Sequence, residues 1–157
     1  MSKAVNVYVD SCVFLSWFKD EPDADECKGL FDSADKGEIK IITSSITLTE
    51  VIKLNRSIEI PHTDVIKLRN FFEKDFIMIA SLERRIAEKA RELIWKNPHL
   101  QPKDSIHLAT AIYLEIQKLY TFDNDLLKLK DIFPDILICK PDIPYVQQIP
   151  ISMQPMP

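Results

Sequence analysis

Short apolar runs rich in β-branched residues alternate along the chain with longer segments whose apolar residues recur every three or four positions. Runs of the first kind predict buried strands, and segments of the second kind predict amphipathic helices. The predicted strands cover residues 5–9, 39–43, 76–80, 119–122 and 136–139. Because strands and helices alternate, we expect an α/β fold, a three-layer α/β/α sandwich around a parallel sheet of about five strands.

Helix caps, prolines at helix starts and the spacing of apolar residues place helices between the strands. Asp10 or Ser11 is expected to cap the first helix, and Pro102 to occupy the first turn of a later one. Thr47 and Glu50 have the spacing of a capping box. The predicted helices start after residue 10, at Pro22 and at Pro102, and also cover residues 44–55, 62–74, 81–96 and 124–130.

Proline becomes frequent near the end of the chain and leaves little room for a helix there. We expect one domain over residues 1–140, followed by an extended or partly disordered proline-rich tail over residues 141–157. Tyr145, Val146 and Ile149 are the tail residues suited to pack on the domain. A length of 157 residues and a hydrophobic content of 46% are those of one domain with a substantial core.

Charge, cysteine and glycine content exclude several classes of function. A net charge of −4 argues against a protein that coats nucleic acid, though not against a nuclease whose metal-binding acids lower the charge. Three widely spaced cysteines without a CxxC pair argue against a disulfide scaffold or a zinc ribbon. With only Gly29 and Gly37, the chain has no GxGxxG loop, P-loop or GxSxG elbow. The absence of signal-peptide features and of a membrane-spanning run predicts a cytoplasmic protein with no membrane partner.

Four carboxylates fall where a strand gives way to a helix or where a helix begins: Asp10, Glu50, Asp104 and Asp123. In an open α/β sheet such junctions meet at the carboxyl end of the strands, where ligands bind. Acids gathered there repel one another, and a hard divalent cation with oxygen ligands gives a reason for their proximity. The pattern therefore predicts a metal-dependent phosphodiesterase, with Asp10 as a bridging ligand and Asp125 as a candidate fifth acid.

Each acid also has a purely structural interpretation. Asp10 and Asp123 are suited to cap helices, and Glu50 to complete its capping box. Asp104 would be favoured in a first helical turn by the helix dipole. These roles together describe the main alternative, a non-catalytic binding or scaffold domain on the same fold. A phosphatase with an aspartyl nucleophile is disfavoured, because it uses an Asp-x-Asp pair where this chain has Asp10-Ser11-Cys12.

Four segments carry these acids in order: Tyr8-Val9-Asp10-Ser11, Ser44 to Glu50, Lys103 to Ala109, and Thr121 to Asp125. Together they resemble the PIN domain, particularly the VapC-type toxins of bacterial and archaeal toxin–antitoxin pairs, from Val5 to about Cys139. The resemblance implies an endoribonuclease that depends on Mg²⁺ or Mn²⁺. It carries the metal-binding and catalytic role to the four acids, with Asp125 as a further metal candidate. Ser11 and Thr121 stand where the family commonly places hydroxyls, which would orient carboxylates or waters.

The resemblance also implies three partners: an RNA substrate, an antitoxin whose segment covers the active site, and a second copy in a homodimer. An RNA-processing nuclease outside a toxin–antitoxin pair is the alternative. Cys12 replaces a common Asn of the family, which puts a polar role for that side chain in doubt. Lys53, Arg56 and Lys103 are candidates to meet phosphates. His107, one turn after Asp104, could point toward the site or bond locally within its own helix, and the local bond is the favoured interpretation.

Overall fold

The computed structural model describes residues 3–52, 54 and 58–147, and a five-stranded parallel sheet forms its centre. The strands are β1 (Val5–Val9), β2 (Ile39–Ser44), β3 (Ile77–Ala80), β4 (Lys118–Tyr120) and β5 (Leu137–Cys139). Their order in the sheet is β3-β2-β1-β4-β5, and every neighbouring pair is parallel. The predicted parallel sheet is confirmed.

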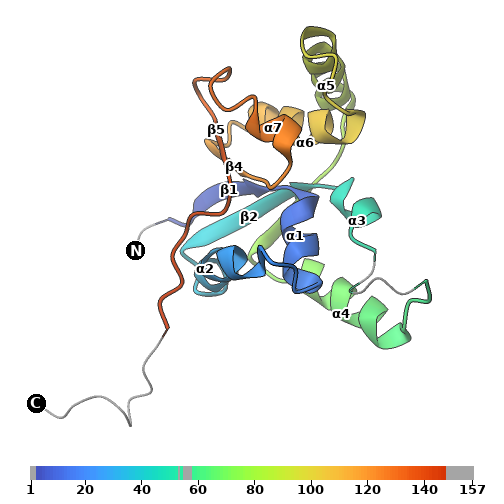
Figure 1. Cartoon of the computed structure of the whole chain (residues 1–157), viewed down its shortest axis with the longest axis vertical. Helices are drawn as coiled ribbons and strands as arrows, with labels where there is room; N and C mark the ends of the chain where they lie inside the picture. Colours follow the sequence, from blue (N-terminus) through green and yellow to red (C-terminus); the bar gives the residue numbers. More distant parts are fainter. Residues whose placement is uncertain (1–2, 53, 55–57, 148–157) are drawn as a thin grey trace, which may run out of the picture.

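Helices cover both faces of this sheet, which confirms the predicted three-layer sandwich (Figure 1). One layer consists of α1 (Ser11–Phe18), α2 (Ala24–Asp35) and α4 (His62–Phe72). The other consists of α5 (Arg84–Lys96), α6 (Pro102–Tyr113) and α7 (Asn124–Leu127). A short helix, α3 (Thr47–Glu50), follows β2.

The central strands supply side chains to both cores, because successive residues of a strand point to opposite faces. Val7 and Val9 of β1 pack against the α1, α2 and α4 layer. Tyr8 points the other way and joins the core under α5 and α6. Ile41 and Ile42 of β2 divide in the same manner. The site described below is therefore attached to strands that are anchored on both sides.

The helix predicted over residues 44–55 is wrong, since only Thr47–Glu50 is helical and residues 53 and 55–57 lie outside the described part of the chain. The predicted capping box is also wrong. Ile46 is the N-cap residue and makes no side-chain cap bond, while the hydroxyls of Thr43 and Thr47 lie 2.6 Å apart. Thr47 therefore ties α3 to β2, and the carboxyl of Glu50 is left for other contacts.

The order of the strands creates a switch point between β1 and β4. From β1 the chain proceeds to β2 and β3 on one side, and returns to β4 and β5 on the other. Ligand sites of open α/β sheets lie at the carboxyl ends of the strands beside such a point. Asp10 directly follows β1, and its N–H donates to Tyr120 O at the end of β4 (3.0 Å). The first predicted acid thus lies at the place where this topology leaves a crevice.

The described part of the tail, residues 141–147, lies on the body of the domain without helix or strand. Asp142 accepts hydrogen bonds from Lys118 Nζ (2.9 Å) and Tyr120 Oη (2.8 Å). Ile143 O lies so close to α2 that a Cβ at Gly29 would stand 1.8 Å from it. A domain boundary at residue 140 stays a prediction, and Ile149 lies outside the described residues.

Within the described residues, no helix has the length and hydropathy needed to cross a membrane.

Candidate functional site

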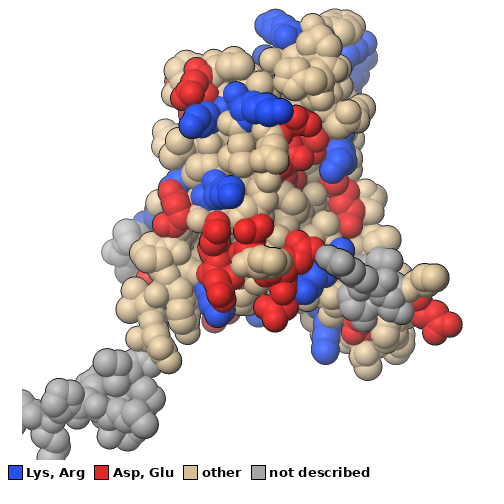
Figure 2. Space-filling model, viewed as in Figure 1, with Lys and Arg blue, Asp and Glu red and all other residues tan. Residues whose placement is uncertain are grey.

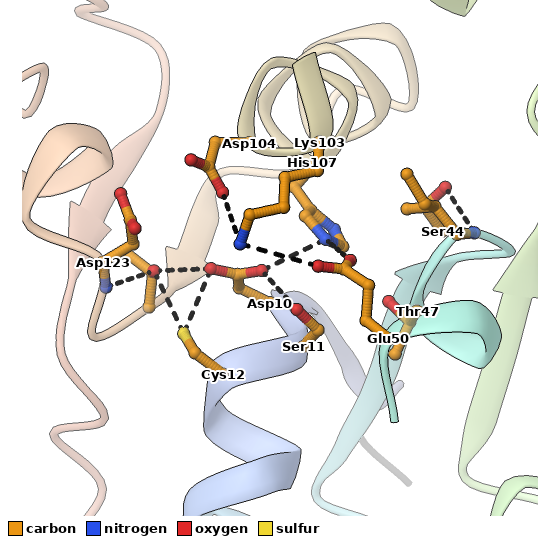
Figure 3. A network of polar contacts seen from close by, with 12 residues as sticks. Asp10, Ser11, Cys12, Ser44, Thr47, Glu50, Lys103, Asp104, His107 and Asp123 are labelled. Carbon is orange, nitrogen blue, oxygen red and sulfur yellow. Dashed lines mark hydrogen bonds and ion pairs between the residues drawn. The ribbon is translucent and has the colours of Figure 1, made fainter. Parts of the chain in front are cut away.

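The four predicted acids come together around the amine of Lys103 (Figure 3). Lys103 Nζ lies 3.7 Å from Glu50 Oε2 and 3.6 Å from Asp104 Oδ1. Burial opposes the charged form of Lys103, but the carboxylates of Asp104, Glu50, Asp10 and Asp123 outweigh it and raise its pKa. Carboxylates from four separate segments of the chain thus lie around one amine, as the sequence pattern predicts.

Asp10 is buried, and four side chains hold its carboxylate in place. Oδ2 accepts from Thr121 Oγ1 (2.7 Å) and from Cys12 Sγ (3.1 Å). Oδ1 accepts from Ser11 Oγ (3.3 Å) and lies 3.2 Å from His107 Nε2. Asp10 is the N-cap residue of α1, but its side chain makes no cap bond. The carboxylate is therefore turned into the site, with the predicted hydroxyls of Ser11 and Thr121 both against it.

Cys12 has a polar role, which resolves the doubt raised by its replacement of Asn. Besides its contact with Asp10, its sulfur accepts the N–H of Phe122 (3.3 Å) and lies 3.5 Å from Thr121 Oγ1. Burial, reinforced by the charge of Asp10, raises the pKa of the Cys12 thiol. The thiol of Cys12 therefore serves as a hydrogen-bond donor to Asp10.

His107 points into the site, so the prediction of a local bond within its helix is wrong. Its Nε2 lies 2.8 Å from Glu50 Oε1, and its Nδ1 lies 2.7 Å from Tyr8 Oη. The imidazole is fully buried. Burial opposes protonation, but the hydrogen bond to Glu50 and the charge of Asp10 raise the pKa of His107. The sequence holds one signal for this: His107 lies three residues after Asp104, hence on the same side of α6.

Asp104 and Asp123 complete the group of acids. Asp104, 3% exposed in the first turn of α6, has its pKa raised to about 6, first by burial and then by the charge of Asp123. Asp123 caps α7, since Oδ1 accepts the N–H of Leu126 (3.0 Å), and here the structural interpretation is correct. Asp125 pairs with Lys128 at 3.4 Å, and no described contact joins it to the four acids.

The donor chemistry of the site fits a hard divalent cation. Mg²⁺ and Mn²⁺ prefer carboxylate oxygens, and burial together with the charges of Asp123 and Asp10 raises the pKa of Asp104. In the arrangement described, however, no three His, Cys, Asp or Glu side chains are positioned to hold a metal ion together. Lys103 and His107 lie between the acids instead. A metal ion would thus compete with the amine of Lys103 for the oxygens of Glu50 and Asp104.

The surrounding surface carries mixed charge. In the view of Figure 2, Asp and Glu side chains gather in the lower middle of the face, where Figure 1 places α1 and α2. Lys and Arg side chains are scattered above and beside them. Of the basic residues predicted to meet phosphates, Lys103 lies in the site, whereas Lys53 and Arg56 fall outside the described residues. Among the described residues in this view, Lys and Arg side chains therefore form no continuous basic track for a nucleic acid.

Comparison with known proteins gives a family and a set of similar folds. The family model described as PIN domain matches residues 7–132. A comparison with curated proteins found no match.

Three solved structures share the fold at TM-scores of 0.56–0.62. VapC20 of Mycobacterium tuberculosis, described as a sarcin-ricin loop cleaving toxin, is 17% identical over 83% of this chain and 98% of its own (TM-score 0.61). VapBC2 of Rickettsia felis, bound to a DNA fragment from its promoter, is 20% identical over 88% of this chain and 100% of its own, with a TM-score of 0.62. A toxin–antitoxin complex from Klebsiella pneumoniae is 19% identical over 87% of this chain and 98% of its own, with a TM-score of 0.56. At these identities the likeness shows the fold.

Proposed function

The chain belongs to the PIN domain family, and from that premise we propose that it is a divalent-metal-dependent endoribonuclease, the toxin of a VapBC-type toxin–antitoxin pair. One observation carries the proposal. Four carboxylates from separate segments surround the half-exposed amine of Lys103 at the switch point of the sheet. Such a concentration of negative charge costs stability unless a ligand offsets it. A divalent cation held by these carboxylates would offset it.

The chain's own residues have defined tasks in this proposal. Asp10, Glu50, Asp104 and Asp123 would hold Mg²⁺ or Mn²⁺, and Thr121 and Ser11 would keep the Asp10 carboxylate oriented. When bound, the ion lowers the pKa of a water and stabilises the leaving oxygen in phosphodiester hydrolysis. Asp125 would take part only from the outer edge of the site, since its partner is Lys128.

The hydrogen bonds of the acids favour this proposal over a scaffold domain. A scaffold explains the acids as helix caps, and only Asp123 makes such a bond. The side chain of Asp10 makes no cap bond, and Glu50 faces His107 instead of completing a capping box. The buried Asp10 and the half-buried Glu50 therefore do not cap a helix with their side chains.

Cleavage of mixed cellular RNA by purified protein tests the proposal. We expect cleavage with Mg²⁺ or Mn²⁺, none with chelator, and none by Asp10→Asn. Asp131→Asn, which removes an exposed acid away from the site, is the matched control and should cleave normally. Cleavage by Asp10→Asn, or in chelator, would contradict the proposal. No cleavage and no stabilisation by metal would favour the scaffold domain, whereas stabilisation alone would indicate a narrow substrate.

An antitoxin and a second copy of the chain belong to the same proposal. Two of the similar structures are toxin–antitoxin assemblies by description. Around α3 and α4 this chain exposes large apolar side chains, Leu48, Ile52, Ile58, Ile60 and Ile66. Exposed apolar patches commonly mark protein interfaces. Light scattering of the purified chain should give the mass of a homodimer. Growth arrest on expression would favour a toxin over an RNA-processing enzyme.

A further inference from the structure

A buried series of hydrogen bonds runs from the backbone of β2 to Glu50 and passes close to Asp10. The N–H of Ser44 donates to Tyr8 Oη (3.0 Å), which lies 2.7 Å from His107 Nδ1. His107 Nε2 lies 2.8 Å from Glu50 Oε1 and 3.2 Å from Asp10 Oδ1. Ser44, Tyr8 and His107 each expose none of their surface. Within the described residues, no buried side-chain nitrogen or oxygen lacks a partner.

The acids determine where the imidazole of His107 carries a hydrogen. Ionised carboxylates only accept hydrogen bonds, so Nε2 carries a hydrogen that donates to Glu50 Oε1, while Asp10 Oδ1 lies 3.2 Å from the same nitrogen. The Tyr8 hydroxyl, which accepts the Ser44 N–H, contacts the other ring nitrogen, Nδ1. Tyr8 thus ties the imidazole to the sheet through the nitrogen that does not face the acids.

We propose that His107 is a positioning residue whose Nε2–H holds the Glu50 carboxylate beside Asp10, in the arrangement that takes up a divalent metal ion, with Tyr8 holding the imidazole in place. The inference rests on the proposed function and deepens it. Asp10 comes from the end of β1 and Glu50 from α3, so their mutual placement depends on a group that contacts both. The imidazole of His107, which projects from α6, contacts both carboxylates.

Metal affinity measures this role without any substrate. Hydrogen-bond partners of metal ligands typically contribute about 10–100-fold to metal affinity. We expect His107→Leu, which removes the donor, to bind Mn²⁺ about 10–100-fold more weakly. His107→Gln offers an amide N–H in place of Nε2 and should retain most of the affinity. Tyr8→Phe keeps the imidazole but frees its orientation, so its affinity should fall between the two.

The closing experiment measures the Mn²⁺ dissociation constant of the metal-free protein by the electron paramagnetic resonance signal of free Mn²⁺. His99→Leu, an exposed histidine outside the site, is the matched control and should equal the wild type. Equal or tighter binding by His107→Leu would make His107 a competitor of the metal and overturn the inference. Equal losses in His107→Leu and His107→Gln would also overturn it, because filling space would then be its only role.

Side-chain ¹⁵N spectra of the wild-type protein decide the question if His107→Leu does not fold. The chain has three histidines, so His62→Gln and His99→Leu suffice to assign the signals. A hydrogen on Nε2 of His107 is expected, and a bare Nε2 would overturn the inference. Wild-type protein that binds Mn²⁺ but cleaves no RNA would contradict the nuclease and leave the inference standing. Wild-type protein that binds no Mn²⁺ would contradict both.

Discussion

Asp10 shows how much of the site is fixed before a ligand arrives. Both of its carboxylate oxygens are held, one by Thr121 and Cys12 and the other by Ser11 and His107. Such contacts restrict the carboxylate to one orientation, which lowers the entropic cost of binding a ligand there. The cost of this order is the burial of charge and the repulsion among the acids, which together raise the pKa of Asp104 to about 6.

Thr121→Val should destabilise the protein by roughly 1–3 kcal/mol in chelator. The substitution keeps the shape of the side chain but removes the donor to Asp10 Oδ2 and the acceptor of the Asp123 N–H. Urea denaturation measures the change in the free energy of unfolding. Thr63→Val, at an exposed position of α4, is the control. A Thr121→Val protein as stable as the wild type would show that Asp10 is not held by this hydroxyl.

Asp104→Asn should raise the melting temperature of the metal-free protein. The carboxylate is buried, and Asp123 and Asp10 both act against its charge, so removing the charge relieves desolvation and repulsion. With millimolar Mn²⁺ the order should reverse, because the wild type then gains stability from binding. Differential scanning fluorimetry in chelator and in Mn²⁺ gives both comparisons. An unchanged order in Mn²⁺ would speak against Asp104 as a metal ligand.

The acids could be predicted from sequence, whereas most groups that hold them could not. Asp10, Glu50, Asp104 and Asp123 are visible because strand ends and helix starts are local features. The contact between Tyr8 and His107 joins residues 99 positions apart and depends on how α6 lies across the sheet. No local pattern encodes that placement.

At the scale of elements, the largest error concerns the segment after β2. Apolar spacing predicts a helix over residues 44–55, but the described helix ends at Glu50. β-branched residues are dense here, at Ile46, Thr47, Thr49, Val51 and Ile52, and they disfavour a helix by losing side-chain freedom. The hydrogen bond between Thr43 and Thr47 also ties the segment to the sheet. Low helix propensity and the contact with the sheet therefore end this helix earlier than the spacing of apolar residues predicts.

Gly29→Ala should destabilise the full chain but stabilise a chain from which the tail has been removed. In the full chain the added Cβ would stand 1.8 Å from Ile143 O, so the tail must move and stability should fall. In a chain ending at residue 140, the alanine should stabilise α2 by about 1 kcal/mol through helix propensity. Melting temperatures of all four proteins test this. The same sign in both backgrounds would show that the tail does not pack on Gly29 in solution.

Asp142→Asn should cost less than about 1 kcal/mol at neutral pH, because its ion pair with Lys118 is largely exposed. Burial opposes the charged form of Asp142, but hydrogen bonds from Lys118 and Tyr120 outweigh it and lower its pKa. The stability it contributes is therefore present above the usual aspartate pKa of about 4 and lost as the pH falls further. Urea denaturation from pH 3 to pH 7 should show the difference from the wild type shrinking at the acid end. Asp131→Asn is the control.

At the scale of the molecule, the parallel sheet was predictable and its strand order was not. Alternating strands and helices indicate the sandwich, but the switch point between β1 and β4 follows from pairings such as Tyr8 with Leu119, which no local pattern shows. That switch point gathers the acids. Among the described basic residues, Lys103 lies in the site, so a bound cation and Lys103 would supply positive charge to an RNA phosphate there.

The most direct test of the metal-dependent nuclease is to follow RNA cleavage and melting temperature over one series of Mn²⁺ concentrations. If the four acids hold the ion that cleavage requires, both quantities should rise and saturate over the same range, and both responses should vanish in Asp10→Asn. Cleavage that proceeds without added metal, or that persists in Asp10→Asn while stabilisation is lost, would contradict the account.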